Sequence, residues 1–119
     1  HIVNADMLSR LKRGALLINT SRGGLVETEA VVEALKSGQL GGLALDVYEQ
    51  EADLFYRDWS STVVSDDVFE RLLSFPNVIV TGHQAFFTRE AITTICQTTI
   101  DSLSEFAAGR TLSNELRLD

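Results

Sequence analysis

The feature that most constrains the fold is a pair of short apolar segments separated by an amphipathic one. The runs "ALLIN" at 15–19 and "GLALDV" at 42–47 flank "TEAVVEALKSG" at 28–38, whose apolar residues recur at helical spacing. A short, fully apolar run is typical of a strand that is buried on both faces of a parallel sheet. Strand, helix and strand within about 30 residues predict a βαβ unit with parallel strands and a right-handed crossover. We therefore expect an α/β fold.

Cap residues and apolar spacing predict the remaining elements. They are a short helix capped by Asn4 and ended by Gly14, a helix over 66–73, a third buried strand over 78–81, and a long helix from Thr88 to near Gly109. The polar and aromatic stretch 48–65 has no stable period and is expected to be a long loop.

Composition excludes several classes of function. The 119 residues carry a net charge of −7, which argues against nucleic-acid binding, because such binding needs a basic surface. No apolar run approaches the roughly 18 residues of a membrane span. The single cysteine, Cys96, cannot form an internal disulfide, which favours a reducing compartment and a cytoplasmic location. No pattern of metal ligands stands out, and we expect no metal.

The charged residues that are able to do chemistry follow the predicted strands. Arg22 follows the first strand, Asp46 and Glu51 close and follow the second, and His83 follows the third. In open α/β sheets ligands bind beyond the carboxyl ends of the strands, where these side chains are expected to converge. Arginine binds carboxylates bidentately, histidine exchanges protons, and a carboxylate stabilises the protonated imidazole. This set suits proton transfer at a hydroxyl or carbonyl group beside a carboxylate.

Each of these residues also has a purely structural interpretation when it is taken alone. Arg22 is compatible with a loop-capping role, His83 with an ordinary loop histidine, and Asp46 with a turn cap. Glu51 is compatible with a solvated charge in the acidic run "EQEAD". Their joint placement at one edge of the sheet favours the functional interpretation.

Three sequence blocks resemble a known family. The blocks "INTSRGGLV", "LALDVYEQE" and "VTGH" occur in this order and at the spacing found in the cofactor domain of D-isomer-specific 2-hydroxyacid dehydrogenases. The resemblance extends over nearly the whole chain. The insert "DLFYRDWSSTVVSDDVFERL" and the run "HQAFFT" most resemble the fermentative D-lactate dehydrogenases of that family.

The resemblance implies a role for each matching residue. Arg22 binds the substrate carboxylate, His83 is the acid that protonates the carbonyl oxygen, and Glu51 keeps His83 protonated. Four residues are implied to line the cofactor site: Thr20, Ser21, Arg22 and Asp46, the last beside the nicotinamide amide. Phe86 is implied to lie near the side chain of the substrate. The implied substrate-binding residues are therefore Arg22, His83 and Phe86. The implied cofactor is NAD, and the implied substrate pair is pyruvate and D-lactate.

The resemblance also implies an organisation. Residues 1–86 are expected to form the second half of a Rossmann-like, doubly wound NAD-binding domain. Residues 87–119 are expected to return to a flavodoxin-like substrate domain. No G-x-G-x-x-G occurs, so the phosphate-binding turn is expected upstream, in a longer protein. We expect this chain alone to be inactive and the intact enzyme to be a homo-oligomer. The alternative is an NAD(H)-sensing binding module similar to the co-repressors of the same family.

Overall fold

The computed structural model describes residues 1–55, 58–62 and 65–116 and divides the chain into two compact units. The first unit is His1–Ala85 and the second is Phe86–Asp119. The assignment of residues 87–119 to a substrate domain stays a prediction.

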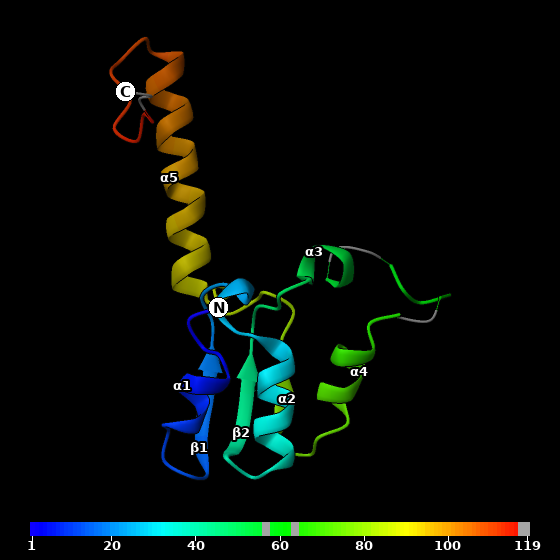
Figure 1. The fold of residues 1–119 in the computed structure, drawn as a ribbon. Helices are drawn as coiled ribbons and strands as arrows, with labels where there is room; N and C mark the ends of the chain where they lie inside the picture. Colours follow the sequence, from blue (N-terminus) through cyan, green and yellow to red (C-terminus); the bar gives the residue numbers. More distant parts are fainter. Residues whose placement is uncertain (56–57, 63–64, 117–119) are drawn as a thin grey trace. The chain divides into compact units, whose positions relative to one another are not determined.

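The first unit contains a three-stranded parallel sheet, as the apolar runs predict. The strands β1 (Ala15–Asn19), β2 (Leu40–Leu45) and β3 (Val78–Val80) lie in the order β1-β2-β3. Figure 1 shows β1 and β2 side by side. Asn19 of β1 pairs with Leu45 of β2, which is also level with Val80 of β3. The three carboxyl ends therefore reach the same edge of the sheet, and the loops that follow them begin side by side.

Four α-helices accompany the sheet in the described part of this unit: α1 (Ala5–Ser9), α2 (Thr28–Lys36), α3 (Glu51–Leu54) and α4 (Asp67–Leu73). The expected Asn4 cap is present, because its side chain accepts a hydrogen bond from the N–H of Met7. Asp66 caps α4 in the same way, accepting from Val68 and Phe69. A 3₁₀ turn, η1 (Gly23–Leu25), follows β1.

The hydrophobic core lies between the helices and one face of the sheet. Val31 and Leu35 of α2 and Leu72 of α4 are buried against Leu43 and Leu45 of β2. Full burial of each such side chain stabilises the fold by about 1.5–3 kcal/mol. This packing fixes the sheet, and with it the loops at its carboxyl edge.

The expectation that the strands are buried on both faces is wrong for the described chain. Leu16 of β1 is 74% exposed and Ile79 of β3 is 66% exposed, whereas Leu17 packs against the core. Side chains alternate between the two faces of a strand, and the helices of this unit cover only one face. The apolar run therefore predicts the strand correctly but not the covering of its second face.

The expected loop over 48–65 is wrong in one place that matters for the site. The short helix α3 begins at Glu51, inside the predicted loop. One carboxylate oxygen of Glu51 accepts a hydrogen bond from the N–H of Tyr48, which closes the turn that starts the helix. Four residues are too few to show a helical period in the sequence. The parts of the expected loop at 56–57 and 63–64 lie outside the described residues.

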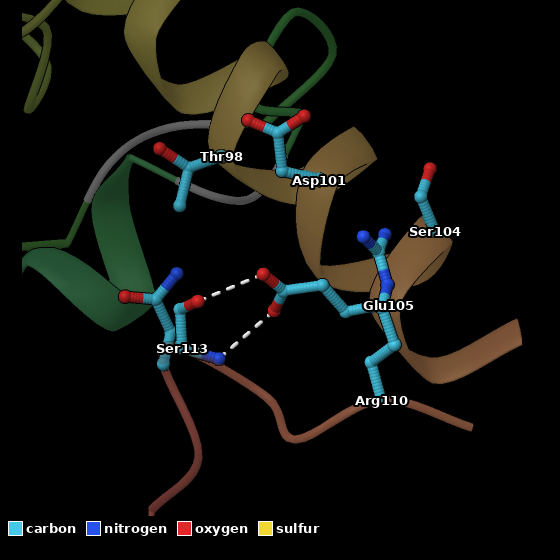
Figure 2. A pocket seen from close by; sticks show the side chains of 7 residues that line it. Thr98, Asp101, Ser104, Glu105, Arg110 and Ser113 are labelled. Carbon is cyan, nitrogen blue, oxygen red and sulfur yellow. Dashed lines mark hydrogen bonds between the residues drawn. The ribbon is translucent and has the colours of Figure 1, made fainter. Parts of the chain in front are cut away.

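The second unit is built around one long helix, α5 (Arg89–Ala107). Thr88 caps it by accepting from the N–H of Ala91, and Gly109, with φ +63°, ends it as expected. Beyond Gly109 the chain turns back, and Ser113 donates two hydrogen bonds to the carboxylate of Glu105 (Figure 2). Among the described residues, none of the helices combines the length and apolarity needed to cross a membrane.

Candidate active site

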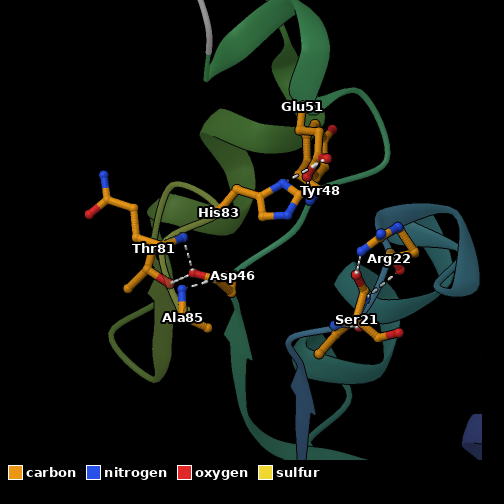
Figure 3. Close-up of polar contacts among 10 residues, drawn as sticks. Ser21, Arg22, Asp46, Tyr48, Glu51, Thr81, His83 and Ala85 are labelled. Atoms are coloured by element: carbon orange, nitrogen blue, oxygen red, sulfur yellow. Dashed lines mark hydrogen bonds and ion pairs between the residues drawn. The ribbon is translucent and has the colours of Figure 1, made fainter. Parts of the chain in front are cut away.

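The predicted residues gather on the loops that follow the three strands (Figure 3). Arg22 lies on the loop after β1, Asp46 directly follows β2, and His83 lies on the loop after β3. Because β2 is the central strand, Asp46 stands between the other two loops. The spatial order agrees with the convergence expected from the sequence.

His83 and Glu51 form the central pair of the site. Nδ1 of His83 lies 3.1 Å from Oε1 of Glu51, and both side chains are partly buried. The second oxygen of Glu51 accepts the N–H of Tyr48 at 3.1 Å. Glu51 is therefore held by its own turn while it faces the imidazole. A carboxylate in this position can accept a hydrogen bond from the Nδ1–H group and so fix the orientation of the ring.

The backbone of His83 is held in an uncommon conformation. Its φ is +55°, in the left-handed region that residues other than glycine seldom adopt. Its N–H donates to the carbonyl of Asp46 at 2.7 Å, and also to the carbonyl of Thr81 at 3.0 Å. The loop therefore presents the imidazole from a turn that is tied directly to the end of the central strand.

Asp46 is the most enclosed charged group of the site, with 4% of its surface exposed. Its carboxylate accepts hydrogen bonds from the hydroxyl of Thr81, from the N–H of Gln84 at 2.8 Å and from the N–H of Ala85 at 2.9 Å. Burial alone would raise the pKa of Asp46. These three bonds, aided by the nearby charge of His83, outweigh burial and leave the pKa below its ordinary value.

Arg22 lies across from the His83–Glu51 pair, on the β1 side of the site (Figure 3). Its Nη1 donates to the carbonyl of Ser21 at 2.7 Å, so the guanidinium rests on its own loop. The loop is shaped by buried Asn19, which donates to the carbonyl of Arg22 and accepts from the N–H of Ser21. These hydrogen bonds hold the backbone of Arg22 at the carboxyl edge of the sheet, and the Arg22 side chain is exposed.

Gly23 brings the Arg22 loop against the Glu51 loop. A Cβ atom at Gly23 would lie 2.1 Å from the carbonyl oxygen of Tyr48 and 2.5 Å from the amide nitrogen of Glu49. Only glycine permits two backbone segments to approach this closely. The contact therefore sets the separation between the loops that carry Arg22 and Glu51.

The remaining predicted residues are placed as follows. Thr20 and Ser21 are exposed directly after β1. Phe86 belongs to the second unit, where its ring packs edge-on against Phe87 with centroids 6.2 Å apart. Its expected contact with substrate stays a prediction.

Sequence reasoning missed Asn19, Tyr48 and Thr81. Asn19 had a readable signal, since an asparagine often bonds the backbone two residues further on, as it does here with Ser21. Tyr48 and Thr81 act through long-range contacts, with Asp66 and Asp46 respectively, and carry no local signal.

The first unit has polar residues where a nucleotide could bind. Thr20 and Ser21 are exposed directly after β1, and Asp46 directly follows the central strand. This edge is where open α/β sheets bind nucleotides. Among the described residues, no group of three or more histidine, cysteine or acidic side chains is placed to hold a metal ion.

Comparison with known proteins identifies the class. Residues 1–85 match the NAD-binding domain of the D-isomer specific 2-hydroxyacid dehydrogenases. The chain is 59% identical over 116 residues to 2-hydroxyacid dehydrogenase A of Aspergillus oryzae, covering 98% of this chain and 33% of the relative. It is 49% identical to the D-lactate dehydrogenase of Escherichia coli, covering 98% of this chain and 35% of that enzyme.

A solved structure gives the same result. The pyruvate reductase of Chlamydomonas reinhardtii superimposes with a TM-score of 0.87 at 44% identity, over 95% of this chain and 35% of that one. The chain belongs to the D-isomer specific 2-hydroxyacid dehydrogenase family, an oxidoreductase family whose matched domain binds NAD. It spans about a third of the length of the curated relatives it matches.

Proposed function

We propose that this chain supplies the acid–base centre of an NAD-dependent D-lactate dehydrogenase that reduces pyruvate to D-lactate. The observation that carries the proposal is the His83–Glu51 pair, with Nδ1 and Oε1 3.1 Å apart at the carboxyl edge of the sheet. The names of the Escherichia coli and Chlamydomonas reinhardtii relatives support lactate and pyruvate as the substrate pair.

The proposed mechanism assigns one task to each residue. NADH, when bound, supplies a hydride to the carbonyl carbon of the 2-oxo acid. Protonated His83 donates its proton to the carbonyl oxygen as the alcohol forms, and neutral His83 accepts the proton in the reverse direction. Glu51, paired with Nδ1, fixes the ring orientation and stabilises the imidazolium before transfer. With Nδ1 facing Glu51, Nε2 is the ring nitrogen assigned to the substrate.

The substrate and cofactor contacts follow the same edge. Arg22 would leave its contact with Ser21 and bind the substrate carboxylate through two parallel N–H donors. We assign Thr20, Ser21, Arg22 and Asp46 to the nicotinamide side of the cofactor. Phe86 is assigned to the side chain of the substrate.

Activity belongs to the intact enzyme in this proposal, and the chain alone is inactive. The sequence contains no G-x-G-x-x-G, and the sheet leaves Leu16, Ile18 and Ile79 exposed on one face. We propose that the intact enzyme is a cytoplasmic homo-oligomer that serves fermentation.

The test is an assay of the intact protein that carries this sequence. NADH oxidation is followed with pyruvate, with bulkier 2-oxo acids and without substrate, for the wild type, His83→Ala and His1→Ala. We expect rapid oxidation with pyruvate, a loss of about 10²- to 10⁴-fold in kcat for His83→Ala, and normal turnover for His1→Ala. His1 is the matched control, because it is the other histidine of the chain.

Other outcomes separate the alternatives. Turnover of a bulkier 2-oxo acid in place of pyruvate would retain the mechanism and change the substrate. Near-normal turnover by His83→Ala would contradict the assignment of the acid. Bound NADH without turnover of any 2-oxo acid would favour the NAD(H)-sensing module.

A further inference from the structure

We propose that Asp46 is a positioning residue that holds the His83 loop in its active geometry, in addition to any contact it makes with the cofactor. The inference rests on the proposed role of His83 as the acid. It assigns to Asp46 and Thr81 a joint function, which is to fix the backbone on both sides of the acid. We call the contacts between Asp46 and residues 81–85 the Asp46 clamp.

The clamp consists of four hydrogen bonds that a single residue accepts. The carboxylate accepts from the Thr81 hydroxyl and from the N–H groups of Gln84 and Ala85, at 2.8 and 2.9 Å for the two amides. The carbonyl of Asp46 accepts the N–H of His83 at 2.7 Å. Donors from both sides of His83, and from His83 itself, therefore converge on the residue that ends β2.

The loop needs such an anchor because it is short, exposed and unusual in its backbone. Thr81, Gly82, Gln84 and Ala85 are all exposed, so hydrophobic packing contributes little to their position. His83 has a φ of +55°, which is unfavourable for a side-chain-bearing residue unless its surroundings enforce it. The four bonds provide this enforcement.

The chemistry of the anchor favours aspartate. An ionised carboxylate offers about four acceptor sites and no donor, so it can take three donors at once. Asparagine would turn an N–H₂ group toward at least one of those donors. The Asp46 carboxylate accepts three hydrogen bonds from the loop, and only 4% of the surface of Asp46 is exposed. Most of its hydrogen-bonding capacity is therefore used within the protein.

The segment after β2 therefore holds His83 at two points. Asp46 fixes the backbone of the histidine loop, and Glu51, five positions later, pairs with the ring at 3.1 Å. Because the transfer geometry depends on both, loss of the clamp should reduce kcat while the binding surfaces for substrate and cofactor are retained. A shift of about 1 Å in a reacting group is sufficient to cost about 10²-fold in rate.

The experiment uses four variants of the intact enzyme. Thr81→Val removes one donor of the clamp and keeps the Asp46 charge, and Thr81→Ser restores the donor. Thr99→Val is the matched control, because the Thr99 hydroxyl donates to the carbonyl of Ile95 on exposed α5. Asp46→Asn weakens the clamp at its centre. The readouts are kcat, KM for pyruvate, Kd for NADH, and amide hydrogen exchange at Gln84 and Ala85.

We expect Thr81→Val to lower kcat about tenfold, the equivalent of one net hydrogen bond, with KM and Kd changed by less than about twofold. Thr81→Ser should recover most of the loss, and Thr99→Val should match the wild type. Asp46→Asn should accelerate exchange at both amides about tenfold or more.

Two results would overturn the inference. One is wild-type kcat for Thr81→Val. The other is weaker NADH binding by Asp46→Asn while exchange at Gln84 and Ala85 remains slow, which would restrict Asp46 to a cofactor contact. A wild-type enzyme without turnover, in which the two amides still exchange slowly, would instead contradict the proposed function and leave the clamp as a structural feature.

Discussion

Nδ1 of His83 lies 3.1 Å from Oε1 of Glu51, although 32 positions separate the two residues in the sequence. The pair forms because β2 and β3 are neighbouring parallel strands, so the loops that follow them meet at one edge. In the proposed mechanism, this contact orients the imidazole that donates the proton. Its contribution to turnover is directly measurable.

Glu51→Gln should lower kcat in the intact enzyme by about 10- to 100-fold, because a hydrogen bond to a charged group is worth about 1.5–3 kcal/mol. Glutamine keeps the size of the side chain and removes its charge. Glu49→Gln is the matched control, since Glu49 contacts His1 and Thr28. Steady-state kinetics measure the effect, and an unchanged kcat for Glu51→Gln would show that the pair is structural only.

Arg22→Lys should raise KM for the 2-oxo acid by about tenfold or more while leaving the Kd for NADH within about twofold of the wild type. Lysine keeps the charge but cannot offer two parallel donors to a carboxylate. Arg10→Lys is the control, because Arg10 forms an exposed pair with Asp6 on the surface of α1. An unchanged KM would contradict the proposal that Arg22 binds the substrate carboxylate.

The sequence predicts the three strands, with the second displaced by two residues, and the edge of the sheet at which the proposed site residues lie, because both follow from local patterns. The run "ALLIN" matches β1 at both ends, and a residue that follows a parallel strand must lie at its carboxyl edge. Arg22, Asp46 and His83 are located by this rule alone. No knowledge of their partners is needed to place them there.

The contacts that hold these residues are not predictable in the same way. The three donors to the Asp46 carboxylate lie 35 to 39 positions away, and the Tyr48 hydroxyl reaches Asp66, 18 positions away. Such contacts depend on the register of β2 against β3 and on the path of the connecting loops. The exposed face of the sheet is equally invisible in the sequence, because an apolar side chain looks the same whether or not a second layer covers it.

Gly23→Ala should destabilise the protein by about 1–3 kcal/mol, the usual cost of overpacking a site that cannot yield. The added Cβ would meet the backbone of Tyr48 and Glu49, at 2.1 Å from the carbonyl oxygen of Tyr48. Gly24→Ala is a close control, because a Cβ at Gly24 has no heavy atom within 4 Å. Denaturant unfolding of the intact protein measures both. Equal stability of the two variants would contradict the close approach of the two loops.

Tyr48→Phe should lower the free energy of unfolding by about 1.5–3 kcal/mol, because the hydroxyl donates to a carboxylate. Tyr48 is buried, and its hydroxyl lies 2.8 Å from Oδ2 of Asp66. Burial and the charge of Asp66 raise the pKa of Tyr48, so the hydroxyl stays protonated and remains a donor over the accessible pH range.

A double-mutant cycle isolates the Tyr48–Asp66 bond. Asp66→Asn keeps the oxygen that caps α4, since asparagine is also a good N-cap. Tyr48→Phe should therefore cost clearly less in the Asp66→Asn background than in the wild type. Purely additive effects would mean that the two residues are not coupled.

The pH dependence of stability should report on the Asp46 clamp. The pKa of Asp46 is lowered in the folded protein, because hydrogen bonds from Thr81, Ala85 and Gln84 outweigh the opposing effect of burial. A group with a depressed folded pKa stabilises the fold above its unfolded pKa, about 3.9 for aspartate, and loses this contribution as the pH falls through the folded value. The stability difference between the wild type and Asp46→Asn should therefore be largest near neutral pH and shrink below about pH 4. At low pH the wild-type carboxyl is protonated and resembles the amide of asparagine.

Denaturant unfolding at several pH values measures the difference in stability between the wild type and Asp46→Asn, with Asp6→Asn on exposed α1 as a control for the loss of one charge. A difference that stays constant from neutral to acidic pH would mean that the charge of Asp46 does not hold the loop.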